Sequence, residues 1–325
     1  MSLKIKLWGV RGSLPSPILP DVLLWRVEEI LTQYQKLIDA KVPISPQTFI
    51  DTLPIHLTSG YGGNTSCAEV TCGDDRLIID AGSGIRGFSD YIMKTAPTTS
   101  DFHIYFTHYH WDHLIGLPFF TPLYLKGRTV HFYSVDDELE RSLRTLFRKP
   151  NFPVPFEVVS KQIKTHKLSP REPAKVGSIQ FTPYELDHPD PCWGIRIEAA
   201  GKTVAWAVDH EGQRHSPEQL GADMALFRNV DLMVYDAQYT FDEALEKINW
   251  GHSSAPIGID LAIREQIKQA IFVHHDPAAN DEQIRHAEEQ TSHYYEDLLK
   301  QRKRGGLDAP NLQWRFGREG EVLEP

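Results

Sequence analysis

Residues 107–113 have the sequence Thr-His-Tyr-His-Trp-Asp-His and directly follow a short apolar segment. That segment predicts a strand, and alternate residues of an extended chain share one face. His108 and His110 are therefore expected to converge on one metal ion. Asp112 and His113 follow where the chain turns toward a helix, so they point elsewhere and suit a second ion. Imidazole and carboxylate groups at this density indicate a site for zinc or manganese.

The rest of the chain alternates predicted strands and helices, which indicates an α/β or α+β class. Strands are expected near 4–10, 67–72, 76–80, 101–107, 130–133, 178–184, 193–199, 203–208, 231–235 and 270–274. Helices are expected near 21–39, 46–53, 136–147, 254–268 and 281–301. The Pro-rich segment 150–175 is expected to be irregular. A single domain, 1–325, is expected because no repeat or low-complexity linker interrupts it, with a helical insertion at about 18–58.

Composition narrows the class of protein. The chain has 325 residues and a net charge of −10, without any block of Lys and Arg. Proteins that hold long nucleic acid usually carry a basic stripe, so no long nucleic acid is expected as a partner. The three cysteines lack metal-ribbon spacing and are expected to be packed thiols. No signal peptide and no apolar run of about 18 residues is found, so we expect a soluble, cytoplasmic protein without membrane contact.

The HxHxDH pattern resembles the metallo-β-lactamase superfamily, and other motifs of that superfamily follow in order over nearly the whole chain. The resemblance implies a four-layer αββα sandwich with two metal ions at one edge of the sheets. The residues that it assigns to the metals are His108, His110 and His188 for one ion, Asp112, His113 and His275 for the other, and Asp209 as a bridge between them. It also implies that Asp80 is a buried aspartate that orients the site.

Three of these positions have competing interpretations. His274 directly precedes His275, and His275 is preferred because relatives of this type place the ligand second in the pair. His210 follows Asp209 and is expected to be a partner of a ligand or a surface residue. Cys192 either lines the pocket or packs in the core, and packing is favoured.

The segment Trp250-Gly251-His252-Ser253-Ser254 resembles a motif of the phosphodiesterase branch, which includes the tRNA 3′-processing endonucleases. There the histidine contacts the scissile phosphate, and a helix start offers free N–H groups to an anion. Turns at 9–13 and 62–67 resemble hydrolases described as cyclic-nucleotide phosphodiesterase-like. They place Asn64 near the metals or form tight turns under the site. The interval between His188 and Asp209 leaves no room for a tRNA-binding arm.

The resemblance therefore implies a dinuclear metal-dependent phosphodiesterase that acts on a small or cyclic-nucleotide-like phosphodiester, with zinc preferred over manganese. In the implied mechanism a metal-bridging hydroxide attacks phosphorus, Asp112 acts as base and His252 protonates the leaving oxygen. Alternatives are a metal-dependent thioesterase or lactonase, and a non-catalytic metal- or nucleotide-binding sensor. The 18–58 insertion is expected to be core, a lid or a homodimer contact.

Overall fold

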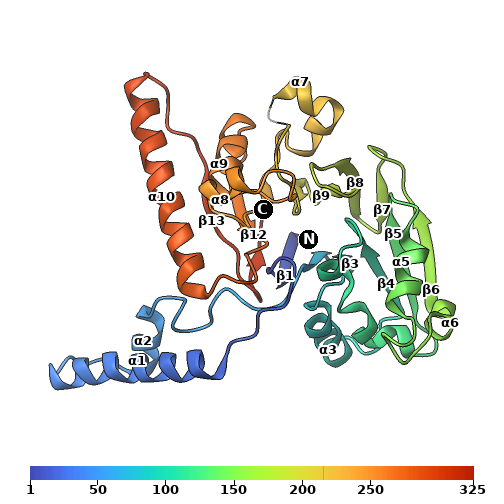
Figure 1. The fold of residues 1–325 in the computed structure, drawn as a ribbon, viewed down its shortest axis with the longest axis horizontal. Coiled ribbons are helices and arrows are strands. Elements are labelled where there is room, and N and C mark those ends of the chain that lie inside the picture. Colours follow the sequence, from blue (N-terminus) through green and yellow to red (C-terminus); the bar gives the residue numbers. More distant parts are fainter. Residues whose placement is uncertain (215) are drawn as a thin grey trace.

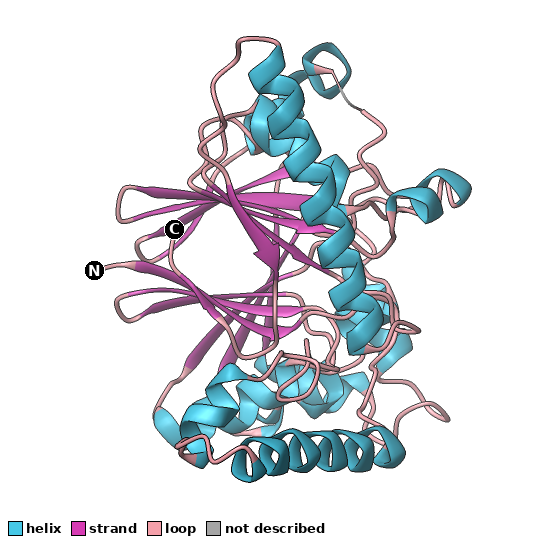
Figure 2. Cartoon of the chain, turned by 90° about the vertical axis from the view of Figure 1, so that its left-hand side faces the viewer, coloured by secondary structure: helices cyan, strands magenta, loops and turns pink. Residues whose placement is uncertain are grey.

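The computed structural model describes residues 1–214 and 216–325. Two seven-stranded sheets lie face to face, with strand orders β14-β1-β2-β3-β4-β5-β6 and β13-β12-β11-β10-β9-β8-β7. Helices cover the outer face of each sheet (Figures 1 and 2). The four-layer αββα sandwich expected from the sequence is therefore confirmed.

The first sheet is formed by β1 (Leu3–Gly9), β2 (Cys67–Cys72), β3 (Asp75–Ile79), β4 (Asp101–Tyr105), β5 (Thr129–Ser134), β6 (Ile163–Lys167) and β14 (Val322–Leu323). The helices of this half are α3 (Ile85–Thr95), α4 (Trp111–Leu114), η1 (Leu117–Phe119), η2 (Thr121–Tyr124), α5 (Leu139–Leu146), α6 (Phe156–Val159) and η3 (Ser160–Gln162). The strands β3, β4 and β5 run parallel, so their carboxyl ends meet at one edge.

The second sheet is formed by β7 (Ala174–Val176), β8 (Ile179–Glu185), β9 (Trp193–Ala199), β10 (Lys202–Ala207), β11 (Leu232–Asp236), β12 (Gln269–Val273) and β13 (Gln313–Phe316). Its helices are α7 (Pro217–Leu220), η4 (Gly221–Leu226), α8 (Phe241–Glu246), α9 (Ala255–Arg264) and α10 (Asp281–Arg304). Here β10, β11 and β12 run parallel, which again gathers carboxyl ends at one edge.

The main core lies between the two sheets. Strand β1 alternates buried and less buried residues, and its Leu3, Ile5 and Leu7 join Ile197 and Trp206 from the opposite sheet in one buried cluster. Strand β11 is buried along its whole length because helices cover its second face. That double burial explains why β11 is continuously apolar up to its last residue.

Several elements were not predicted. The segment 150–175 was expected to be irregular, but it contains α6, η3, β6 and the start of β7. Strand β6 lies at the edge of its sheet and has no buried residue, so it carries no apolar alternation to detect. The predicted helix 254–268 ends at Arg264, and Gln266 adopts a positive φ of 56°. Strands β13 and β14 are short pieces near the C-terminal end that also went unpredicted.

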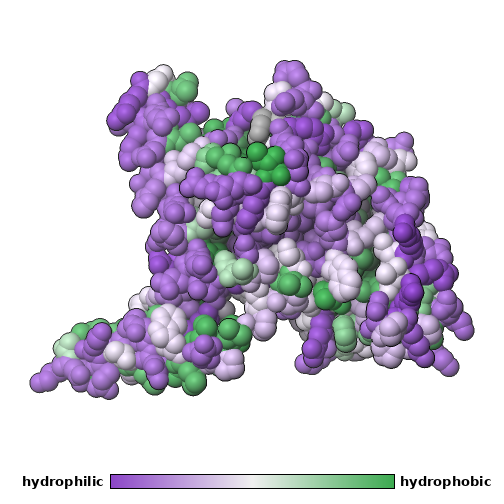
Figure 3. All heavy atoms as spheres, in the orientation of Figure 1, coloured by the Kyte–Doolittle hydropathy of each residue, from purple (hydrophilic) through white to green (hydrophobic). Residues whose placement is uncertain are grey.

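The region 18–58 forms α1 (Pro20–Asp39) and α2 (Pro46–Thr52), which extend away from the sandwich as an arm (Figure 1). Tyr34 and Phe49 join the two helices through a ring contact of 5.1 Å. The apolar stripe of α1 was expected to be core, a lid or a dimer contact. Its Leu23 and Leu31 are exposed, which disagrees with the core interpretation, and hydrophobic atoms line the arm in Figure 3. Across the described residues, no helix has the length and apolarity to cross a membrane.

Candidate metal centre

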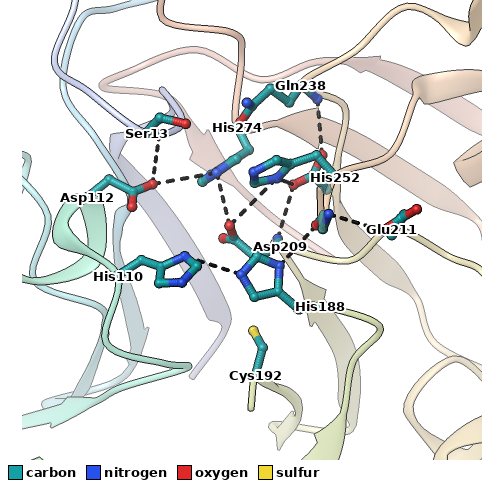
Figure 4. A network of polar contacts seen from close by, with 12 residues as sticks. Ser13, His110, Asp112, His188, Cys192, Asp209, Glu211, Gln238, His252 and His274 are labelled. Carbon is teal, nitrogen blue, oxygen red and sulfur yellow. Dashed lines mark hydrogen bonds and ion pairs between the residues drawn. The ribbon is translucent and has the colours of Figure 1, made fainter. Parts of the chain in front are cut away.

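The predicted site residues gather where the carboxyl ends of both sheets meet. Each comes directly or shortly after a strand, so the parallel segments of the two sheets deliver them to one edge. These residues are Asp80 after β3, His108, His110, Asp112 and His113 after β4, His188 after β8 and Asp209 after β10. After β12, the residue brought to this edge is His274 and not the predicted His275. Figure 4 shows side chains from these loops pointing toward one another.

The first group consists of His108, His110 and His188, whose candidate ligand atoms all lie within 4.8 Å of one another. His188 Nε2 is 3.2 Å from His110 Nδ1. His108 is buried, and its Nε2 has no hydrogen-bond partner among the described residues. The three histidines predicted to hold one ion are therefore brought together.

The second group consists of Asp112, His113, Asp209 and His274, again with candidate ligand atoms within 4.8 Å of one another. Asp209 is at its centre, with Oδ2 2.9 Å from His113 Nε2 and Oδ1 3.1 Å from His274 Nε2. All four residues are buried. This group matches the predicted second ion except at one position.

The donor atoms of the two groups fit metal ions. Four buried atoms lack a hydrogen bond within the described chain, namely His108 Nε2, His113 Nε2, His274 Nε2 and Asp209 Oδ2. The three atoms of the second group lie close together around the Asp209 carboxylate, and His108 Nε2 belongs to the first group. Buried polar atoms are normally satisfied, so these four are exceptions. Imidazole nitrogen and carboxylate oxygen are the ligands that zinc prefers alongside thiolate. One cation in each group would satisfy His108 in the first and the other three atoms in the second.

The electrostatics of the two groups differ. Burial lowers the pKa of His108 and of His188, so both rings stay neutral, which is the form that binds a metal. Burial alone would lower the pKa of His274. The attraction of the Asp209 carboxylate for the charged ring is stronger and raises this pKa to about 9. The pKa of His113 is likewise raised, because Asp209 and Asp112 outweigh burial. The second group thus carries carboxylate charge that a metal cation would balance in place of protons.

Asp80 lies beneath both groups and is fully buried. Its carboxylate accepts hydrogen bonds from His113 Nδ1 at 2.8 Å, from the Thr107 N–H at 2.9 Å and from the Thr107 hydroxyl at 3.0 Å. The Thr107 hydroxyl oxygen is also 3.1 Å from His108 Nδ1. One carboxylate therefore fixes the ring of a histidine in each group, directly in one case and through Thr107 in the other.

The prediction of His275 as a ligand is wrong in this structure. His275 Nε2 lies 2.9 Å from the Gly317 carbonyl oxygen, and its ring stacks on Phe316, away from both groups. His274 occupies the expected place instead. The physical reason lies in the backbone, because His274 adopts a positive φ of 66° directly after β12, which directs the first histidine of the pair to Asp209.

The two Gly-rich turns have different roles. The Asn64 side chain donates to Glu319 Oε1 at 2.7 Å and accepts from the Ser83 hydroxyl at 2.9 Å, so it braces loops and joins neither metal group. The turn at 9–13 does reach the site, because the Ser13 N–H donates to Asp112 Oδ2 at 2.8 Å. A Cβ at Gly12 would lie 2.6 Å from the His274 ring, so only glycine fits there.

The structure also shows the surroundings of Cys192 and His210, for which the sequence left two interpretations each. Cys192 is buried with Sγ 3.6 Å from His108 Nδ1, so it packs against a site histidine. His210 Nδ1 accepts a hydrogen bond from the Asp187 N–H at 3.0 Å. His210 belongs to neither group of candidate ligands, in agreement with its predicted supporting role.

His252 lies at the edge of the second group, where its ring stacks on His274 with centroids 5.0 Å apart. Its Nδ1 is 3.0 Å from Asp236 Oδ2, an aspartate that the sequence analysis missed. Asp236 also accepts from the Ser253 and Asp209 N–H groups at 3.0 and 3.2 Å. A carboxylate that ends the wholly apolar strand β11 is the sequence signal that would have found it.

Gly251 contacts His188 of the first group and so holds the turn before His252 against it. Its carbonyl oxygen lies 3.2 Å from His188 Nδ1. Its φ is +86°, and a Cβ there would lie 2.1 Å from His188 Nδ1. The Gly-His pair therefore depends on glycine both for backbone conformation and for close approach.

Residues 75–275 match a family described as "Beta-lactamase superfamily domain". A Ribonuclease Z of Staphylococcus carnosus (strain TM300) is 24% identical over 176 residues, which is 52% of this chain and 54% of that protein. This chain thus spans about half the length of that relative.

Solved structures share the fold. A diphosphatase from the PhnP family has a TM-score of 0.59 and 17% identity over 99% of this chain and 97% of that one. Unliganded yeast PDE1 has a TM-score of 0.63 and 13% identity over 100% of this chain and 99% of that one.

Proposed function

The chain belongs to the β-lactamase superfamily, and on this basis we propose that it is a metal-dependent phosphodiesterase acting on a small phosphodiester. One observation carries the proposal: His252 is held by Asp236 at 3.0 Å directly beside the candidate ligands. An imidazole oriented by a carboxylate is placed to donate a proton to a leaving oxygen.

The residues proposed to hold metal are His108, His110 and His188 for one ion, Asp112, His113 and His274 for the other, and Asp209 between them. Zinc suits this set of nitrogen and oxygen donors best, with manganese as the alternative. When bound, such ions supply Lewis acidity that stabilises negative charge on phosphoryl oxygens and lowers the pKa of water.

The chain itself positions the protons. Asp112 is fixed by the Ser13 N–H, so it is placed to accept a proton from the attacking water. Asp236 accepts the hydrogen bond of His252 Nδ1, which leaves Nε2 as the atom that donates a proton to the departing oxygen. The proposed base and the proposed acid are thus separate groups, Asp112 for the water and His252 for the leaving oxygen.

Two observations support a small substrate. The interval between His188 and Asp209 is filled by the hairpin of β9 and β10, so it holds no protruding arm. The net charge of −10 disfavours a long polyanion. The comparisons agree with phosphoester chemistry, since the relatives carry the names Ribonuclease Z and diphosphatase. The buried, free cysteines suit a reducing compartment, and we therefore propose a cytoplasmic location.

The test is hydrolysis of bis-p-nitrophenyl phosphate by protein of measured metal content, with p-nitrophenyl butyrate as a carboxylic ester for comparison. We expect diester turnover that exceeds ester turnover. For a diester with an alkoxide leaving group, such as thymidylyl-thymidine, we expect a fall in kcat of about 100-fold or more in His252→Gln at unchanged metal content, because p-nitrophenolate leaves without a proton and an alkoxide does not. Ester turnover without diester turnover would instead establish the thioesterase or lactonase class. Unchanged kcat in His252→Gln would remove the proposed role of the Asp236–His252 pair.

A further inference from the structure

Two exposed tryptophans adjoin the candidate metal centre. Trp111 is 72% exposed and stands between His110 and Asp112 in the chain, and Trp250 is 63% exposed and directly precedes Gly251. Large aromatic side chains are costly to leave in water and are seldom placed there without a partner. Their position next to proposed site residues suggests that this partner is part of the substrate.

Both tryptophans are attached to fixed backbone. Glu211 is buried, and its carboxylate accepts the N–H groups of Asn249 at 2.7 Å and Gly251 at 3.0 Å, one on each side of Trp250. Trp111 is the first residue of α4, and its carbonyl accepts from the Ile115 N–H at 2.7 Å. An exposed ring on a fixed backbone loses little freedom when it stacks on a ligand.

One imidazole joins the two attachment points. His188 contacts His110 through Nε2 at 3.2 Å and the Gly251 carbonyl through Nδ1 at 3.2 Å. Figure 4 shows His110 and His188 side by side at this edge of the site. The chain neighbours of Trp111 and Trp250, His110 and Gly251, therefore contact the same histidine of the first metal group through its two ring nitrogens.

Other aromatic or apolar side chains lie in the hollow beside Trp111, which Glu138 and Arg141 also line, and near Trp250 in the chain. Trp111 lines a hollow of about 400 Å³ together with Tyr109, Phe119 and Phe152. Near Trp250 in the chain, Phe241, Leu245 and Ile248 are exposed. A flat, weakly polar group such as a nucleobase suits both places, because any base offers a π-face to an aromatic ring.

We propose that Trp111 and Trp250 stack on planar groups on either side of the scissile phosphate, so that the substrate is a linear diester joining two nucleosides. A cyclic mononucleotide carries one base and closes both ester bonds on one ribose, so it can use only one of the two rings. The inference rests on the proposed phosphodiesterase function and narrows its substrate class.

The kinetic test compares thymidylyl-thymidine, which has a base on each side of the phosphate, with methyl p-nitrophenyl phosphate, which has one planar arm. Trp111→Ala and Trp250→Ala are each expected to raise KM for the dinucleotide about 10-fold. For the one-armed diester, at most one of the two variants is expected to raise KM. Trp111→Phe and Trp250→Phe keep a ring and should recover most of the loss.

Trp25→Ala is the matched control, because Trp25 is 46% exposed but lies on the arm helix α1. It should leave KM unchanged for both substrates. Binding without chemistry is measured on the metal-loaded protein with the methylphosphonate analogue of thymidylyl-thymidine, followed by quenching of tryptophan fluorescence. Each alanine variant at the site should raise Kd about 10-fold.

The outcomes separate the two proposals. Turnover of both diesters with KM and Kd unchanged in Trp111→Ala and Trp250→Ala would overturn the stacking inference and leave the phosphodiesterase function in place. Failure of the metal-loaded wild-type protein to cleave any diester would remove the proposed function. In that case the fluorescence titration of the same variants would still decide whether the two rings bind bases.

Discussion

Asp209 lies where site residues from the two sheets come together. It follows β10, adopts a positive φ of 62°, and contacts histidines that come from the β4 and β12 ends. Burial alone would raise the pKa of its carboxyl, but His274 and His113 outweigh burial and hold it well below its ordinary value. The carboxylate is therefore charged at all working pH values, as a metal ligand must be.

The adjacent histidines His274 and His275 allow a matched pair of substitutions. His274→Ala is expected to remove a proposed ligand and lower bound metal measurably, because Asp209 and Asp112 lose a neighbour. His275→Ala should keep the metal and lower the melting temperature, since its ring packs on Phe316 and bonds Gly317. Elemental analysis and thermal unfolding of both variants check this. Loss of metal in His275→Ala with retention in His274→Ala would reverse the assignment.

Substitution of Asp80 tests whether its hydrogen bonds orient the site residues, since Asp80 is not itself a proposed metal ligand. Asp80→Asn keeps the shape of the side chain but weakens the hydrogen bonds that hold His113 and Thr107. We expect metal affinity to fall about 10- to 100-fold. Competition against a chelator of known affinity measures this. An affinity equal to that of the wild-type protein would show that the ring of His113 needs no such support.

At the scale of elements, strands β4, β5 and β6 carry a stack of histidines outside the site. His103 lies over His131 with centroids 4.6 Å apart, and His131 lies over His166 at 5.1 Å. Burial, reinforced by His131, lowers the pKa of His103 to about 4. Asp101 and Asp75 act in the opposite direction but do not compensate.

This stack predicts a loss of stability in mild acid. The unfolded chain binds a proton at His103 near pH 6.5 and the folded chain only near pH 4, so stability is full above pH 6.5 and declines as pH falls toward 4. In His103→Gln, the free energy of unfolding should fall by about 1–2 kcal/mol less over this pH range, after allowance for solvent screening of this half-buried group. Urea unfolding at pH 7.5 and pH 5 measures it. An identical decline in both proteins would contradict the stack as its source.

The elements also show what sequence patterns can and cannot predict. Strands with one buried face and helices with apolar spacing were predicted close to their observed bounds, as for β2, β9 and α10. The edge strand β6 was missed because its side chains are mostly exposed. The ligand histidines were found because they are adjacent in sequence to strand ends. The choice between His274 and His275 depended on a backbone angle. The pairing of Asp236 with His252 depended on the end of β11 meeting the loop before α9, which no local pattern encodes.

On the scale of the whole molecule, the arm of α1 and α2 is tied to the sandwich by a buried ion pair between Arg26 and Asp281. Asp281 also accepts the Tyr61 N–H at 2.8 Å and lies 3.6 Å from Arg11, whose side chain bonds the Gly62 carbonyl. The base of the arm is thus connected to the loops beside the site, while α1 runs outward from the sandwich in Figure 1 and has Arg26 as its buried residue.

The buried ion pair between Arg26 and Asp281 predicts a large loss of stability when its carboxylate is removed. Asp281→Ala leaves the buried guanidinium of Arg26 without its carboxylate, which is expected to cost about 3–5 kcal/mol. Arg26→Met, which removes the charge and keeps apolar volume, should cost less. Denaturant unfolding of both variants tests the difference. Equal stabilities would show that the pair is solvated and unimportant.

The overall charge predicts weak affinity for long nucleic acid. With a net charge of −10, the protein should show no retention of a tRNA precursor at physiological salt in a filter-binding assay. Excess tRNA should likewise leave hydrolysis of bis-p-nitrophenyl phosphate unchanged. Tight, salt-dependent tRNA binding would instead show that a local basic surface overrides the bulk charge.

The central claim is that these loops form a metal-dependent centre for phosphodiester cleavage. Its most direct test is the metal content per chain, measured by elemental analysis alongside hydrolysis of bis-p-nitrophenyl phosphate, before chelation, after it and after zinc or manganese is restored. We predict two metal equivalents per chain, loss of activity on chelation and recovery on addition of one of these ions. Full activity in metal-free protein, or in Asp112→Ala, would contradict the account.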